Sequence, residues 1–233
     1  KQIEEISRFA VAEIDNRKEA IDENEYMQLR SVISDAFRVN RMSNTVLQTY
    51  RAAYDEMRFQ EWLSTLQSPL MQRMSHLEKE IAATDHYPEI IQFAQLNQQH
   101  PPPKKRLALI ERLDLATRAS ELALDSQAAV LHLLLQTINP SLPENQRLDR
   151  KKIDMLTQST REQMKALLGK IAKATYLYTY RDISDKDLTN YIQVYESELG
   201  TRMISLSLNA IHHALQEAAQ YINISSDNLT SLH

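Results

Sequence analysis

The fold is decided by the stretch from Ser184 to Ala219, which reads SDKDLTNYIQVYESELGTRMISLSLNAIHHALQEAA. Nonpolar side chains recur in it every three or four residues, through Leu188, Tyr191 and Tyr195. That spacing places them on one side of an α-helix. A serine followed three positions later by an acidic residue is typical of a helix start. We therefore predict a long amphipathic helix that begins at Ser184.

The same spacing extends over most of the chain and predicts seven to nine helices in all. A long helix is expected from Leu107 to Ile138, because Asn139-Pro140 cannot continue it. Ser43 is the expected N-cap of another helix, and Ser68-Pro69 is expected to interrupt the next one. Further nonpolar stripes begin near Ile3, Tyr26, Leu70, Ile90 and Ile153.

The scarcity of glycine excludes the other fold classes. Only Gly169 and Gly200 occur among the 233 residues. Hairpins and bulges need glycine for positive φ angles, and doubly wound α/β folds need it in phosphate-binding loops. We therefore predict an all-α protein, a multi-helix antiparallel bundle.

Proline marks the clearest division of the chain. Three consecutive prolines at 101–103 favour a polyproline II segment and cannot lie inside a helix. The prediction is an N-terminal helical half at 1–100, a proline-rich hinge at 101–106 and a C-terminal helical half at 107–233. The basic run at 104–106 is interpreted as a solvated face.

Composition restricts the partners and the location. The net charge of −4 disfavours nucleic acid. The absence of cysteine excludes disulfides and thiol catalysis. The densest nonpolar run, from Ala128 to Leu135, is interrupted by His132 and is too short for a transmembrane segment. A start at Lys1 fits an exported protein whose signal peptide has been removed, or a trimmed chain.

Two segments of the chain align with each other at a shift of 129 positions. Residues 59–77 lie over residues 188–206, and Trp62 aligns with Tyr191. The identical pairs are Ser68/Ser197, Leu70/Leu199, Arg73/Arg202, Met74/Met203 and Leu77/Leu206. The alignment predicts that the two halves of the chain are pseudo-repeats, although two amphipathic helices also resemble each other by pattern alone. Trp62 is interpreted as a core anchor.

The second of these segments carries a motif of a known family. It has Tyr178, then Asp187-Leu188, then Tyr195-Glu-Ser197-Glu-Leu199-Gly200-Thr-Arg202-Met203. Over about residues 164–208 the chain resembles the bacterial domain-of-unknown-function family 2059. Members of that family are mostly exported proteins of Gram-negative bacteria, so the resemblance implies a helical bundle in the periplasm. It implies no reaction.

The motif residues are the candidate site. Ser197 and Gly200 are small and lie on nearly one helix face, so another chain segment can approach them closely. The candidate contacts of a groove or partner are Tyr178, Tyr191, Tyr195, Ser197, Gly200 and Arg202. The alternative interpretation is a helix–helix contact inside the bundle.

Motifs of catalysis and cofactor binding are missing from the sequence. His213 and Glu217 have the spacing of two zinc ligands, but no third ligand lies nearby. His76 and His86 lie ten positions apart with nothing that fixes them together. We therefore predict no catalytic residues, no metal and no cofactor.

These observations favour a non-enzymatic periplasmic protein that binds another envelope protein, with a cytoplasmic location as the alternative. The first alternative function is a carrier of a small apolar ligand or lipid. A cavity of about 300 Å³ or more, lined by the tyrosines and by Leu and Met side chains, would favour it. The second alternative is a hydrolytic or metal-dependent enzyme, which requires convergence of histidines such as His76, His86, His212 and His213.

Overall fold

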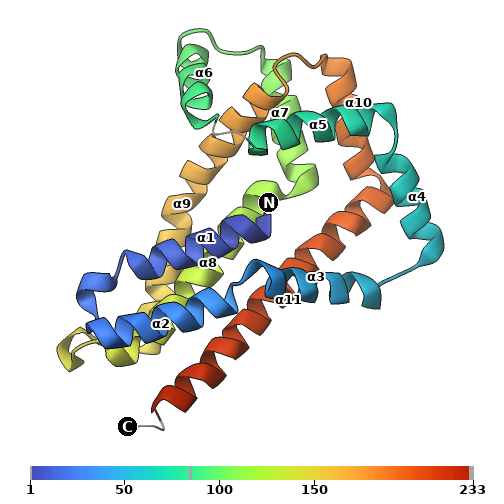
Figure 1. Cartoon of the computed structure of the whole chain (residues 1–233). Helices are drawn as coiled ribbons and strands as arrows, with labels where there is room; N and C mark the ends of the chain where they lie inside the picture. The colour runs from blue at the N-terminus through green and yellow to red at the C-terminus, as the bar shows by residue number, and fades with distance from the viewer. Residues whose placement is uncertain (1, 84–85, 231–233) are drawn as a thin grey trace. The chain divides into compact units, whose positions relative to one another are not determined.

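A computed structural model describes residues 2–83 and 86–230, and for 226–230 only the backbone (Figure 1). The protein is all-α, so the predicted fold class is confirmed. Within those ranges, none of the helices combines the length and apolar character needed to cross a bilayer.

The helices follow one another with short connections. The α-helices are α1 (Gln2–Asp15), α2 (Glu23–Ala36), α3 (Val39–Ala52), α4 (Glu56–Leu66), α5 (Pro69–Ala83), α6 (Tyr87–Gln99), α7 (Lys104–Thr117), α8 (Ala119–Ile138), α9 (Arg150–Thr179), α10 (Asp185–Glu196) and α11 (Glu198–Thr230). Three single 3₁₀ turns lie at Lys18–Ala20, Asn139–Ser141 and Glu144–Gln146.

Local signals place several helix ends correctly. The Ser184 hydroxyl accepts a hydrogen bond from the Asp187 N–H at 3.0 Å, which confirms the predicted cap. Helix α8 ends at Ile138, directly before Asn139-Pro140, and α5 begins at Pro69, as expected. The Ser43 prediction was wrong, because α3 already begins at Val39, after Arg38.

Two predicted long helices are each divided at one residue, so the described part of the chain has more helices than the expected seven to nine. Arg118 has a φ of 53° and a ψ of 28°, the left-handed conformation that ends a helix. Ser197 has an extended backbone and separates α10 from α11. Arginine gives no sign of a break, because it is a good helix former. Serine is a preferred N-cap residue, but the nonpolar spacing continues across Ser197 and predicts one helix there.

The contacts divide the chain into two compact units, each of which is discontinuous in sequence. Unit 1 contains residues 1–53, 123–165 and 207–233, and unit 2 contains residues 54–122 and 166–206. The sequence prediction placed the division at 101–106, whereas that tract lies inside unit 2. Residues of α8, α9 and α11 belong to both units, because long helices pass from one to the other.

In unit 1, α1 packs against α2 and α3. In Figure 1, α1 and α2 lie side by side at the blue end of the chain. The buried side chains lie on the faces that the three-and-four spacing predicts. They include Ile6, Ala10, Ile14, Leu29, Ile33, Phe37, Leu134, Ile138, Ile211, Ala214, Ala218 and Ile222.

In unit 2, α10 packs against α7 and α5, and α4 packs against α5. Its core contains Met71, Met74, Leu109, Ile110, Leu113, Leu177, Tyr180, Ile183, Leu188, Tyr191 and Ile192. Helix α4 buries none of its residues fully, and Trp62 is only half-buried. The prediction that Trp62 is a core anchor was therefore wrong, because its helix lies at the edge of the unit.

One residue of the basic run has a structural role that the sequence did not indicate. The Arg106 side chain is only 11% exposed and forms an ion pair with Asp185 at 3.1 Å. It also donates hydrogen bonds to the carbonyls of Ile183 and Tyr180. Lys105 is 75% exposed, in keeping with the predicted solvated face. Arg106 therefore corrects that interpretation, because the carbonyls of the turn after α9 need a buried donor.

The two aligned segments fold in the same way locally. Residues 59–77 form the corner between α4 and α5, and residues 188–206 form the corner between α10 and α11. Each corner lies at the aligned serine, Ser68 or Ser197. The duplication itself stays a prediction.

Candidate functional site

The two motif tyrosines of α10 point into the core of unit 2. Tyr191 is 2% exposed, and its hydroxyl donates a hydrogen bond to Glu78 Oε1 at 2.6 Å. Tyr180 donates to the same oxygen. The Tyr195 hydroxyl lies 3.1 Å from that of Tyr191. The three phenols therefore form one hydrogen-bonded network with the Glu78 carboxylate.

Burial makes these phenols hard to ionise. Desolvation is the largest cause that raises the pKa of Tyr180, Tyr191 and Tyr195, and the Glu78 charge raises each further. Burial also raises the pKa of the neighbouring Tyr176 to about 12. All four side chains are consequently neutral hydrogen-bond donors or acceptors near neutral pH.

Tyr178 does not join this network. Its ring lies 5.6 Å from the ring of Phe93 in α6 and 4.2 Å from the Arg181 guanidinium carbon. The end of α9 and the turn after it therefore place Tyr178 beside α6, whereas Tyr176 and Tyr180 lie on the side of the tyrosine network.

Ser197 and Gly200 shape the corner between α10 and α11. The Ser197 hydroxyl accepts a hydrogen bond from the Gly200 N–H at 3.0 Å, so it caps α11. A Cβ on Gly200 would overlap the Val194 carbonyl oxygen and lie 2.7 Å from Tyr195 Cα. The spacing of Ser197 and Gly200 is thus explained by the cap of α11 and by the close approach of the two helices at this corner. Ser197 and Arg202 are exposed beside this corner, and a partner contact there stays a prediction.

The histidines weighed as metal ligands, His76, His86 and His213, each have separate surroundings. His213 Nδ1 lies 3.2 Å from Thr49 Oγ1, whereas Glu217 accepts a hydrogen bond from Thr45. His86 lies beside the ring of Tyr178, and His76 is exposed on α5. Among the side chains of residues 2–83 and 86–225, no group of three or more potential metal ligands of the His, Cys, Asp or Glu type comes together.

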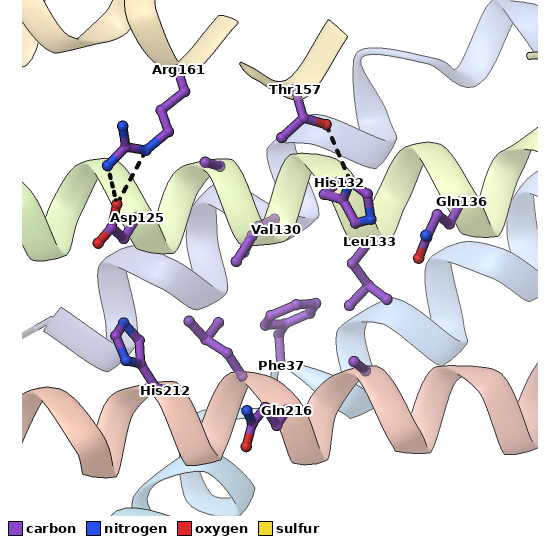
Figure 2. A pocket seen from close by; sticks show the side chains of 14 residues that line it. Phe37, Asp125, Val130, His132, Leu133, Gln136, Thr157, Arg161, His212 and Gln216 are labelled. Carbon is purple, nitrogen blue, oxygen red and sulfur yellow. Dashed lines mark hydrogen bonds and ion pairs between the residues drawn. The ribbon is translucent and has the colours of Figure 1, made fainter. Parts of the chain in front are cut away.

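A pocket lies in unit 1, between α8 and α11, and we call it the α8–α11 pocket. Its volume is about 520 Å³. Figure 2 shows Val130 and Leu133 of α8 and Phe37 pointing into it. It is lined by Phe37, Asp125, Ala128, Ala129, Val130, His132, Leu133, Gln136, Thr157, Arg161, His212, Leu215, Gln216 and Ala219.

Small side chains create the space. Ala128 and Ala129 on α8 and Ala219 on α11 stand at positions that larger residues would fill. Phe37, Val130 and Leu215 are buried beneath them. Ala129 and Gln216 are exposed, so the pocket opens to solvent. The result is an open cleft with a nonpolar floor.

Polar side chains stand at the edge of the pocket, and other residues hold two of them in place. Arg161 Nη2 lies 2.7 Å from Asp125 Oδ1, and both side chains are 30% exposed. His132 Nδ1 lies 3.4 Å from Thr157 Oγ1 and 3.7 Å from Asp154 Oδ1. These contacts join α8 to α9 on one wall of the cleft (Figure 2). The arrangement can accept a molecule with a nonpolar body and a polar end.

No family model, curated protein or solved structure matches this chain. The resemblance to family 2059 thus stays a prediction that depends on the motif around Ser197.

Sequence reasoning did not find the α8–α11 pocket. The available signal was the nonpolar run from Ala128 to Leu135 with His132 inside it. That run contains two adjacent alanines and a polar residue on the same helix, which is typical of a lined cleft as well as of a core helix. Whether this run lines a cleft or packs in a core depends on its position relative to α11, whose pocket residues lie some 80 positions away in the sequence.

Proposed function

We propose that the protein binds a small amphipathic molecule in the α8–α11 pocket. The observation that supports this proposal is a cleft of about 520 Å³ with a nonpolar floor and a polar edge. Sites for small molecules have volumes of about 300–1,000 Å³ and combine nonpolar walls with a few polar groups. The proposal is the carrier alternative of the sequence analysis, transferred from the tyrosines to unit 1.

The walls of the pocket define the ligand class. Phe37, Val130 and Leu133 offer a surface for an acyl chain or a flat hydrocarbon ring system. His132, held by Thr157, and Arg161, held by Asp125, offer donors to a carboxylate or another polar head group. The exposed pocket residues place that head near water, where its desolvation costs little. The proposed role is transport or sensing without chemical conversion.

A dye titration tests the proposal. We expect the neutral dye N-phenyl-1-naphthylamine to bind saturably with a rise in fluorescence, and dodecanoate to displace it. Ala129→Trp places an indole in the open cleft and should weaken dye binding by about tenfold or more, which corresponds to about 1.4 kcal/mol. Ala12→Trp is the matched control, because Ala12 is an exposed helix residue of the same unit outside this pocket.

Two results would contradict the proposal. One is a fluorescence that rises linearly with dye concentration, without saturation. The other is equal binding by Ala129→Trp, Ala12→Trp and the wild-type protein, which would place the dye elsewhere. Circular dichroism of both variants shows whether the helices are retained.

A periplasmic location and an envelope partner are proposals that the family resemblance supports. Immunoblots of periplasmic and cytoplasmic fractions of the source bacterium test the location, with a cytoplasmic signal alone as the contradicting result.

A photoreactive amino acid at Arg202 tests the partner contact, because this side chain is exposed beside the α10–α11 corner. The same label at Lys170, an exposed position of α9, is the control.

A further inference from the structure

Unit 2 contains an unbroken row of oxidisable aromatic side chains. The row, here named the aromatic chain, consists of Trp62, Tyr195, Tyr191, Tyr180 and Tyr176. Successive ring centroids lie 6.2, 5.2, 6.0 and 6.2 Å apart. Helices α4, α10 and α9 with its following turn supply these rings, and the packing of unit 2 brings them into contact.

The aromatic chain leads from the edge of the unit to its core. Trp62 is half-buried on α4, a helix without a fully buried residue, so a small oxidant can reach its indole. Tyr180 has no exposed surface and Tyr191 almost none. Trp62 is the only tryptophan among the 233 residues, so oxidation of an indole begins at a single place.

The buried middle part of the aromatic chain has a proton acceptor in place. A phenol that loses an electron also releases its hydroxyl proton, because the phenol radical cation is a strong acid. The Tyr191 hydroxyl points at Glu78 Oε1 at 2.6 Å, within the range for direct proton transfer. Tyr180 donates to the same oxygen. The Glu78 residue is exposed, so a proton taken from a phenol can pass on to water.

We propose that the aromatic chain conducts single oxidising equivalents from Trp62 to the phenols that are hydrogen-bonded to Glu78. The oxidant is a small one-electron radical, for which the azidyl radical is the probe. Azidyl takes one electron from the Trp62 indole and becomes azide, and the indole loses its N–H proton to water. An electron from Tyr191 then passes through Tyr195 to Trp62, which recovers its proton from water. The O–H bond of Tyr191 breaks, its proton joins the Glu78 carboxylate, and a neutral phenoxyl radical remains.

Two features distinguish the aromatic chain from an ordinary core of packed aromatic rings. Hydrophobic packing alone would be satisfied by phenylalanine, whereas each phenol here keeps a hydroxyl in a buried place. The hydroxyls of Tyr180 and Tyr191 both donate to one carboxylate oxygen, Glu78 Oε1, so the acceptor lies beside the two most buried phenols of the aromatic chain. Both phenols carry their proton at neutral pH and donate it to Glu78, so the electron and the proton leave together.

Pulse radiolysis of the full protein in azide solution tests the proposal. We expect the indolyl radical absorption of Trp62 to decay as the phenoxyl absorption rises, at one first-order rate that does not depend on protein concentration. Tyr195→Phe keeps the ring but removes the oxidisable hydroxyl, and should slow this transfer by at least an order of magnitude. Tyr54→Phe is the control, because Tyr54 is exposed and its ring contacts Phe59 outside the aromatic chain.

Equal transfer rates in Tyr195→Phe and the wild-type protein would overturn the proposal, as would a rate that rises with protein concentration. Glu78→Gln is a second variant that retains a hydrogen-bond acceptor but cannot take the proton. We expect it to lengthen the lifetime of the indolyl radical. An unchanged lifetime would overturn the assignment of Glu78 as the acceptor.

Discussion

The two glycines of the chain provide a pair of identical substitutions with opposite expected effects. Gly200 lies in the first turn of α11, against the last turn of α10. A Cβ there would overlap the Val194 carbonyl oxygen and lie 2.7 and 2.8 Å from Tyr195 Cα and O. Gly169 lies in the interior of α9, and a Cβ there would have no atom within 4 Å.

The magnitudes follow from these surroundings. Alanine in a helix interior is more stable than glycine by about 1 kcal/mol, which is the expected gain for Gly169→Ala. At Gly200 the obstacle is backbone, which cannot rotate away, so the strain should reach about 2–3 kcal/mol, the upper part of the usual range. The Ser197 cap on the Gly200 N–H is also displaced, at about 1 kcal/mol. The gain of about 1 kcal/mol from alanine in a helix offsets the lost cap, so the expected net loss for Gly200→Ala is about 2–3 kcal/mol.

Thermal unfolding followed by circular dichroism measures both effects. For a chain of this size about 1 kcal/mol changes Tm by roughly 2–4 °C. We therefore expect Gly169→Ala to raise Tm by a few degrees and Gly200→Ala to lower it by about 4–12 °C. Equal Tm values for Gly200→Ala and the wild-type protein would refute the close approach of α10 and α11, and a lower Tm for Gly169→Ala would refute the open surroundings of that helix face.

Two further predictions concern stability. Arg106→Ala leaves the turn carbonyls without their charged donor, so we expect the free energy of unfolding in urea to fall by about 2–3 kcal/mol. Lys105→Ala removes an exposed contact with the same Asp185 and should change this free energy by less than about 0.5 kcal/mol. Equal losses in the two variants would contradict the burial of Arg106. The pKa of Tyr176 rises from 10.0 to about 12 on folding, so its contribution to stability is complete below pH 10.0 and is lost as the pH rises toward about 12. A Tyr176→Phe variant should lose less stability than the wild-type protein over that interval, and identical pH profiles would argue against this burial.

Much of the fold was predictable because helix boundaries depend on neighbouring residues. The hydroxyl of Ser184, the missing N–H of Pro69 and the Asn139-Pro140 pair act on backbone within one turn, and each placed a boundary correctly. The break at Arg118 was not predictable, because arginine favours a helix. The break at Ser197 was missed because the three-and-four spacing of nonpolar residues continues on both sides of it, although serine is a preferred N-cap residue. At these two positions tertiary packing ends the helix, although the local sequence favours its continuation.

The candidate site was predictable only in part. Tyr191 and Tyr195 were predicted as contacts of a groove or partner, whereas their hydroxyls lie 3.1 Å apart within unit 2. Their partner Glu78 was not foreseen, because it lies 113 positions from Tyr191 and is one of 31 acidic residues in the chain. The α8–α11 pocket was also missed because its lining residues come from distant parts of the sequence.

The sequence by itself determined that this protein is helical and where several helices start and stop. Those features follow from backbone angles and hydrogen bonds that a residue makes with neighbours up to four positions away. The tertiary structure alone decided that Arg106 is buried, that the Tyr180 and Tyr191 hydroxyls both donate to the Glu78 carboxylate, and that alanines leave a cleft between α8 and α11. Such features depend on which helix faces meet in space. A periodic nonpolar pattern predicts which face of a helix is buried, but not which other helix packs against that face.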